Sequence, residues 1–274
     1  MKKAIKTVLD IVIVVCAIGL AVGFARFGYF FYQKNKTSNM YADISQEVRM
    51  PVVNSTPIGS TTGVAENTDS TDDEVSEPVY QSPINFDMLT DINTDIVAWL
   101  EIKDTLIDYP VLFFSGDDSY YYLNHDFYAN RSAHGSIFFG VDTGYEYKDN
   151  TYRIIYGHHM IDGTMFTDLV KFEDPSFTVE HPVITLYWPD RQVDYQIVSV
   201  FKADVSAETV NAFYYSEYLE RTHENYEYMK TRIKERQLYD LQIDWDEDDE
   251  LLLLSTCEYS TPNGRLVVVG KEIK

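Results

Sequence analysis

Eight short apolar runs, separated by turn residues, make up most of the chain after residue 80, and they restrict its fold class more than any other feature. β-Branched and aromatic residues are frequent in these runs, and Gly, Pro, Asp or Asn stand at their ends. Such runs are typical of β-strands, and many short strands in succession form a barrel or a sandwich. The expected strands are Ile96–Ile102, Thr105–Phe114, Gly135–Gly140, Tyr152–Tyr156, Val183–Tyr187, Gln192–Phe201, Glu250–Ser255 and Arg265–Lys271.

One region of this part departs from the strand pattern. Between Thr222 and Arg236, three apolar residues recur at helical spacing, namely Tyr226, Met229 and Ile233. Thr222 is a suitable N-cap, because its hydroxyl can accept a hydrogen bond from a backbone N–H of the first turn. We therefore predict a helix over residues 222–236 that interrupts the later strands.

An uncharged run, Ile11–Ala25, follows three lysines near the N-terminus and precedes Arg26 and a cluster of aromatic residues. At about 1.5 Å per residue, the stretch Val8–Tyr32 is long enough to cross the hydrocarbon core of a membrane, with Asp10 and Arg26 near the two interfaces. The lysines place the N-terminus in the cytoplasm and the rest of the chain outside. We predict a cytoplasmic N-terminus and a transmembrane anchor in residues 1–33.

A cleaved signal peptide is the alternative for the same segment. The uncharged core is short, and Ala21, Gly23 and Ala25 are small residues of the kind found at cleavage sites. We favour the anchor because the apolar character continues beyond those positions.

Residues 54–78 are rich in Ser, Thr, Asp and Glu and contain few large apolar residues. Such a segment buries too little surface to offset the entropy lost on ordering. We expect an extracellular linker over residues 34–80, a flexible tether apart from a short helix that residues 37–53 could carry. The folded domain is expected to be residues 81–274, able to fold without the segments before it.

The charge distribution excludes one class of partner. The chain has a formal net charge of -22, of which residues 1–36 contribute +5 and the remainder -27. Nucleic-acid binding requires a basic surface, so nucleic acid is not an expected partner. The acidity of the body is sufficiently explained by solubility.

Cys257 is a candidate nucleophile. The chain has two cysteines, and Cys16 lies inside the apolar N-terminal run, so no disulfide is expected and Cys257 is an unpaired thiol. It ends the apolar run of LLLLSTCEYSTPNGRLVVVG, residues 251–270, and Arg265 begins the next strand. A guanidinium lowers the pKa of a nearby thiol and suits an oxyanion. A lone cysteine after four leucines is also typical of core packing.

His158 and His159 follow the predicted strand Tyr152–Tyr156 at a turn marked by Gly157. A histidine titrates near neutral pH, so one of them can carry the proton that thiol chemistry must move. A metal site is the rival interpretation, but adjacent residues of a strand point to opposite faces, and the chain has no CxxC or HExxH motif. We predict no metal, and we expect the other histidines, at positions 125, 134, 181 and 223, on the surface or in turns.

Taken together, these motifs resemble the sortases, and among them class B. Leu253–Cys257 resembles the family's Thr-Leu-x-Thr-Cys strand, with Leu in place of the first Thr, and Arg265 matches its arginine. The turn Tyr156–His158 matches its Tyr-Gly-His turn, and His159 stands where class B relatives commonly have Asn. The resemblance extends over Ile92–Lys271 and includes INTDIVAWLEI, IDYPVLF, YYYLNHDFY, GSIFFG and MIDGTMFTDLVKF.

The resemblance implies a mainly β fold, an eight-stranded mixed β-barrel with peripheral helices, and a cysteine transpeptidase that needs no cofactor. Cys257 would be the nucleophile, His158 the proton-transfer group and Arg265 the oxyanion stabiliser. Secreted proteins with a C-terminal sorting motif would be cleaved through a thioacyl intermediate and transferred to a peptidoglycan amine in a Gram-positive cell envelope. The expected substrate contacts are Leu254, Ser255, Thr256, His159 and Glu258.

Two alternatives remain at this point. The acceptor could be a pilin lysine, which would make the protein a pilus polymerase. The chain could also be a non-catalytic, membrane-tethered surface module in which Cys257 is merely packed, although the set of His158, Cys257 and Arg265 then has no explanation.

Overall fold

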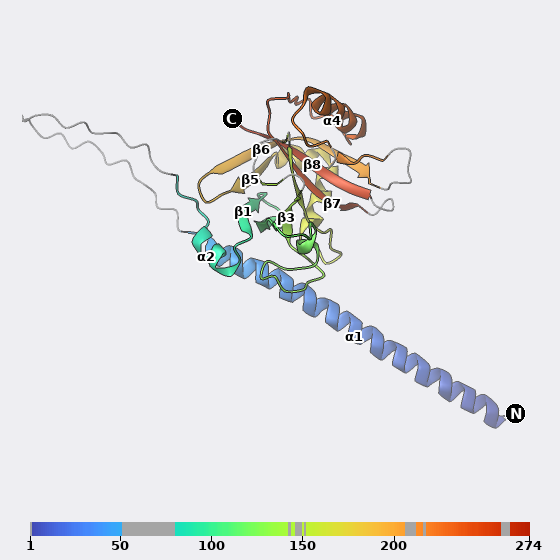
Figure 1. The fold of residues 1–274 in the computed structure, drawn as a ribbon. Coiled ribbons are helices and arrows are strands. Elements are labelled where there is room, and N and C mark those ends of the chain that lie inside the picture. The colour runs from blue at the N-terminus through green and yellow to red at the C-terminus, as the bar shows by residue number, and fades with distance from the viewer. Residues whose placement is uncertain are drawn as a thin grey trace, which may run out of the picture.

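The computed structural model describes residues 2–50, 80–141, 144–145, 150, 152–205, 212–215, 218–258 and 264–274, with the backbone alone at 2–5, 7–10, 257 and 258. Within these residues, eight strands form a closed barrel in the order β1-β2-β3-β4-β7-β8-β6-β5 (Figure 1). Their bounds are β1 (Ile96–Glu101), β2 (Asp108–Leu112), β3 (Ile137–Phe139), β4 (Tyr152–Tyr156), β5 (Val183–Tyr187), β6 (Gln192–Asp204), β7 (Leu251–Glu258) and β8 (Gly264–Glu272).

The barrel is mixed, which confirms the expected fold class. β2 pairs with β3, and β4 with β7, in parallel, and the other neighbouring strands are antiparallel. Each predicted run overlaps one strand, although β6, β7 and β8 extend beyond their predicted ends and the run Thr105–Phe114 begins too early. Residues 102–107 form a turn instead, in which the Thr105 hydroxyl donates to the Ile102 carbonyl and Asp104 has a φ of 62°.

The apolar run at Leu251–Leu254 is continuous because both faces of β7 are buried. Leu252 and Leu254 belong to the main core cluster, whereas Leu251 and Leu253 belong to a second cluster with Tyr226, Met229 and Ile233 of helix α4. A strand covered on both faces shows no alternation of apolar and polar residues. Helix α4 therefore closes the outer face of this part of the barrel.

Helix α4 (His223–Arg236) agrees with the predicted helix, and the Thr222 side chain caps it by accepting from the Asn225 N–H at 3.2 Å. Four shorter helices were not predicted: α2 (Phe86–Ile92), α3 (Pro175–Glu180) and the 3₁₀ segments η1 (Tyr121–Leu123) and η2 (Phe166–Glu173). They are too short for an apolar period to be recognised. The two α-helices among them have polar N-caps, Asn85 before α2 and Asp174 before Pro175 of α3.

Helix α1 (Lys2–Val48) is long and apolar enough, by length and composition, to cross a membrane. Its apolar window has a mean hydropathy of 2.3, and none of that window is buried by the rest of the chain. A signal sequence would pass the same test. In Figure 1 the helix extends away from the barrel as a single rod, with the N-terminus at its far end.

The last turns of α1 pack against the barrel, where the sequence analysis places a linker from residue 34. Four residues of these turns are buried, namely Thr37, Tyr41, Ile44 and Val48. The ring of Tyr41 packs edge-on against that of Tyr109, with the two ring centroids 4.9 Å apart. The four buried positions lie on one helix face, with spacings of three and four residues. The linker therefore does not begin at residue 34, because α1 continues to Val48 and packs against the barrel. The apolar stripe is hard to recognise in the sequence because most other residues between 34 and 48 are polar.

The two flanks of the expected tether are bonded to each other. The Met50 N–H donates to the Pro83 carbonyl at 2.9 Å, and the Asn85 N–H donates to the Val48 carbonyl at 2.8 Å. Arg49 also forms an ion pair with Asp108 of β2 at 2.6 Å. Residues 51–79 lie outside the described residues, but the residues before and after them are bonded to each other. Helix α1 itself therefore connects the N-terminal segment to the barrel.

Replacing Ile44 by Ala should lower the free energy of unfolding by about 2–5 kcal/mol, because it leaves a cavity under a helix that the linker prediction treats as unpacked. The measurement is urea unfolding of a chain that lacks residues 1–28. Gln46→Ala, on an exposed position of the same turn, is the matched control and should change little. Equal effects of the two substitutions would contradict the packing of α1.

Candidate active site

Three neighbouring strands bring the predicted catalytic residues to one end of the barrel. In the parallel ladder of β4 and β7, Tyr156 pairs with Ser255, and in the antiparallel ladder of β7 and β8, Cys257 pairs with Arg265. His158 follows Tyr156 by two residues, just as Cys257 follows Ser255. Neighbouring strands lie about 4.8 Å apart, so the three backbone positions are adjacent. The backbone of Cys257 is described, whereas its side chain lies outside the described residues.

A pocket of about 450 Å³ opens at this end of the barrel. The predicted residues His158, Ser255, Thr256 and Arg265 line it together with Gly157. The remaining lining residues are mostly aromatic or aliphatic: Tyr120, Leu123, Phe138, Tyr156, Val205, Tyr214 and Tyr215. A largely apolar pocket with a few polar groups at one place is the usual form of a binding site.

The imidazole of His158 is held by a backbone group from a distant segment. Its Nε2 lies 2.8 Å from the carbonyl oxygen of Leu123, and a carbonyl can only accept, so Nε2 carries a proton. Nδ1 is therefore the nitrogen that can gain a proton and give it up again, while Nε2 keeps its own. The backbone carbonyl of His158 accepts from the Phe166 N–H at 2.9 Å, which fixes the main chain as well.

Gly157 is required by close packing. A Cβ atom at this position would lie 2.5 Å from Cδ1 of Ile137 and 2.7 Å from the ring of Phe166, both of which belong to the barrel core. Any larger residue would have to move one of these side chains or shift the turn that carries His158. The glycine of the motif thus allows the turn to lie directly on the core.

The other polar groups of the pocket differ in how they are bonded. Ser255 is buried, and its hydroxyl lies 2.7 Å from the hydroxyl of Tyr215. Thr256 is equally buried, but its hydroxyl has no hydrogen-bond partner among the described residues. Arg265 is half-buried, and its Nη1 donates to the carbonyl of Gly264 at 2.9 Å.

Three predicted substrate contacts are not placed in this pocket. Leu254 is fully buried in the main core, because alternate residues of β7 face the barrel interior. His159 lines a different pocket, on the other side of the turn. The side chain of Glu258 lies outside the described residues. Sequence reasoning also assigned no role to Leu123, although it lies in the motif YYYLNHDFY, or to Tyr215, which belongs to none of the quoted motifs.

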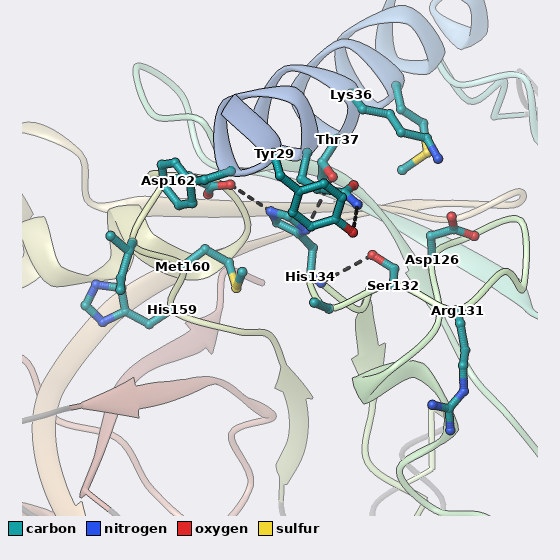
Figure 2. A pocket seen from close by; sticks show the side chains of 15 residues that line it. Tyr29, Lys36, Thr37, Asp126, Arg131, Ser132, His134, His159, Met160 and Asp162 are labelled. Carbon is teal, nitrogen blue, oxygen red and sulfur yellow. Dashed lines mark hydrogen bonds and ion pairs between the residues drawn. The ribbon is translucent and has the colours of Figure 1, made fainter. Parts of the chain in front are cut away.

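The pocket lined by His159 lies between α1 and the segments 131–134 and 159–162, and its volume is about 530 Å³. Figure 2 shows His134 at its centre, bonded to Asp162 at 2.7 Å and to Thr37 of α1 at 3.3 Å. His134 lies in a turn, as expected, but it is only 7% exposed, so it is not a surface residue. Its two ring nitrogens connect α1 to the segment that follows His158.

The described residues contain no group of three or more His, Cys, Asp and Glu side chains arranged to hold a metal ion. His134 and Asp162 lie side by side, but both ring nitrogens of His134 are already bonded to protein atoms.

Comparisons with known proteins agree with one another. A family model described as a sortase domain matches residues 100–273. The chain is 36% identical to Sortase B of Listeria monocytogenes over 187 residues, covering 67% of this chain and 72% of that protein. It is 32% identical to Sortase B of Staphylococcus aureus, covering 69% and 75%. The structure of a Staphylococcus aureus sortase B–substrate complex superposes with a TM-score of 0.59 at 30% identity, covering 71% of this chain and 87% of that one.

Replacing Asp162 by Asn should destabilise the chain at neutral pH by about 1–3 kcal/mol, because a buried carboxylate loses its bonds. Burial would raise the pKa of Asp162, but hydrogen bonds from His134 and Thr164 outweigh it and hold the pKa below its ordinary value. A lowered carboxyl pKa contributes stability above the unfolded pKa of about 3.9, and this contribution is lost as the pH falls through the folded value.

Urea unfolding between about pH 5 and pH 2 measures this dependence. The difference in unfolding free energy between the wild type and Asp162→Asn should shrink as the pH falls. Asp43→Asn, at an exposed position of α1, is the control. A difference that stays constant over this range would show that the carboxylate charge is not what stabilises the pair.

Proposed function

The chain belongs to the sortase family of cysteine transpeptidases, and its relatives are of class B; on this premise we propose that Cys257 is its nucleophile, His158 its proton-transfer group and Arg265 its oxyanion stabiliser. The substrate is a C-terminal sorting motif of secreted proteins, and the acceptor is an amine of cell-wall peptidoglycan. The adjacency of positions 158, 257 and 265 on β4, β7 and β8 carries this proposal. Because the chain belongs to a family of enzymes, we reject the alternative that it is a non-catalytic surface module.

The first half of the reaction forms a thioester. The Cys257 thiolate, whose proton has passed to Nδ1 of His158, attacks the carbonyl carbon of the scissile peptide bond, and the carbonyl oxygen becomes an oxyanion beside the Arg265 guanidinium. As the carbon–nitrogen bond breaks, His158 gives a proton to the leaving amine. The sorting motif is then attached to Cys257 as a thioester, and the C-terminal fragment departs as a free amine.

The second half reverses these roles. The acceptor amine attacks the thioester carbon and loses a proton to His158, and the Cys257 thiolate leaves as the new peptide bond forms. The hydrogen bond from Nε2 of His158 to Leu123 supports this cycle, because it keeps Nδ1 as the nitrogen that gains and loses the proton. The histidine thus returns to its starting state after each turnover.

Of the substrate contacts expected from the sequence, only Ser255 and Thr256 line the pocket. Both are buried, so they shape its wall more than they offer polar contacts to the sorting motif. The aromatic side chains Tyr120, Tyr214 and Tyr215 supply the apolar wall against which a peptide side chain can pack.

The proposed location follows from helix α1. Sortases are enzymes of the cell envelope, and α1 is suited to anchor this one in the cell membrane with its N-terminus in the cytoplasm and residues 81–274 outside. Secreted substrates that are themselves retained at the membrane are then confined to the same surface, which raises their effective concentration at the pocket.

The proposed roles predict distinct losses of activity. Cys257→Ala should abolish cleavage of a sorting-motif peptide and formation of the thioester. Arg265→Ala should lower kcat by about 10²–10³-fold, and His158→Ala by about 10²–10⁴-fold. His159→Ala is the matched control and should cost little, because that residue lines the other pocket. An inactive His159→Ala beside an active His158→Ala would reverse the assignment.

The packing of the turn yields a further prediction. Gly157→Ala should lower kcat by about 10²-fold by displacing His158, since a shift of about 1 Å in a catalytic group can cost that much. Gly270→Ala is the control, because its Cβ would lie 2.8 Å from Cβ of Tyr195, remote from the active-site pocket. It should lower the melting temperature and leave kcat of the folded enzyme unchanged. Equal kcat values for both variants would contradict the role of Gly157.

A further inference from the structure

Ile161 is exposed to an unusual degree for a large apolar residue. Its side chain is 91% exposed, the highest fraction among the large apolar residues that the structure describes. It lies in the segment between His158 and Met165. Two residues after it have a positive φ, Gly163 at 89° and Met165 at 58°. An apolar side chain held in such a position by its backbone suggests that something outside the barrel covers it.

Helix α1 supplies the surroundings of this residue. Ile161 and Met160 line the same pocket as Tyr29, Phe30 and Met40 of α1. Figure 2 shows α1 passing over this pocket, with Tyr29 and Thr37 directed toward His134. The apolar side chains of segment 159–162 are thus grouped with the part of α1 that follows its membrane-spanning stretch.

The position of Tyr29 and Phe30 along α1 gives the height of this pocket. If Arg26 lies at the outer interface, these two residues lie about 4.5–6 Å beyond it, at about 1.5 Å per residue. The headgroup layer is about 5–8 Å thick on each side of the hydrocarbon core. The end of the pocket that Tyr29 and Phe30 line is therefore at the level of the lipid headgroups.

The charged residues around the pocket are compatible with that environment. Lys36 and Arg131 are exposed at its edge. Of the two carboxylates, Asp162 is bonded to His134, and Asp126 accepts from the backbone N–H groups of Tyr128 and Asn130. The two cations are thus exposed to whatever surrounds the pocket, whereas the carboxylates are bonded to partners within the protein.

We propose that segment 159–162 inserts into the headgroup layer of the membrane that α1 crosses, with Ile161 as its apolar contact. The occupant of this surface is the bilayer itself. The bonds from His134 to Asp162 and Thr37 hold the segment at a fixed height on α1. Because His158 directly precedes the segment, the active-site pocket is then held at the membrane surface. This inference rests on the proposed anchoring by α1.

The experiment uses the full chain in lipid nanodiscs, with Cys16→Ser and Cys257→Ser leaving no native thiol. One cysteine is introduced at a time, as Ile161→Cys, Ile273→Cys or Leu20→Cys, and labelled with an NBD fluorophore. Ile273 is 50% exposed near the C-terminus, on the far side of the barrel from α1 in Figure 1, and Leu20 is 64% exposed within α1. Quenching by lipids with a doxyl group near the headgroup is compared with quenching by iodide in the water.

The label at position 161 should be quenched by the doxyl lipid, protected from iodide and shifted to shorter emission wavelength relative to the label at position 273. If it behaves like the label at 273 while that at position 20 is quenched by lipid, the segment lies in water and this inference is overturned, with the anchor intact. If the label at position 20 is not quenched by lipid either, the anchor fails and the inference fails with it. Circular dichroism of each variant verifies that the barrel is folded.

Discussion

The parallel ladder between β4 and β7 is the constraint on which the rest of the site depends. It pairs Tyr156 with Ser255, and so brings the residue after Gly157 level with the end of β7, where Cys257 lies opposite Arg265 of β8. Because side chains alternate along a strand, a slip of one residue would turn His158 to the other face and leave the two remaining groups without it. The alignment is secured on both faces of β7, by Leu252 and Leu254 inside the barrel and by Leu251 and Leu253 beneath α4.

Much of this arrangement could be predicted from the sequence, because strands and caps are local. The runs from Tyr152 to Tyr156 and from Val183 to Tyr187 have the same bounds in the structure, and Thr222 caps the expected helix. What could not be predicted depends on contacts between distant segments. The Leu123 carbonyl that orients His158 is 35 positions away in the chain, and the burial of Leu254 follows from which face of β7 closes the barrel. His134 lies just before the motif GSIFFG and is not part of it, and its burial comes with contacts to the distant residues Thr37 and Asp162.

The misplaced linker shows a different limit of composition. Residues 34–48 include several polar and charged residues and follow an obvious apolar stretch, so they were grouped with the acidic segment after them. Their contribution to the core comes from three or four residues on one face, and a short stripe of that kind is diluted in any average over the segment. The junction at Arg49 and Ile84 then joins the two ends of residues 51–79, so the polar composition of that segment has no bearing on how far the barrel stands from the anchor.

The continuity of α1 from Lys2 to Val48 has a mechanical consequence. A helix that enters the barrel without a break transmits its tilt to the barrel as a rigid lever would, whereas a flexible joint would absorb it. Transmembrane helices respond to bilayer thickness by tilting, leaning further in thin membranes and standing more upright in thick ones. For a chain anchored in this way, the direction in which the active-site pocket opens depends on the thickness of the surrounding lipid. Bilayer composition thus becomes a variable of substrate encounter, even though no lipid takes part in the chemistry.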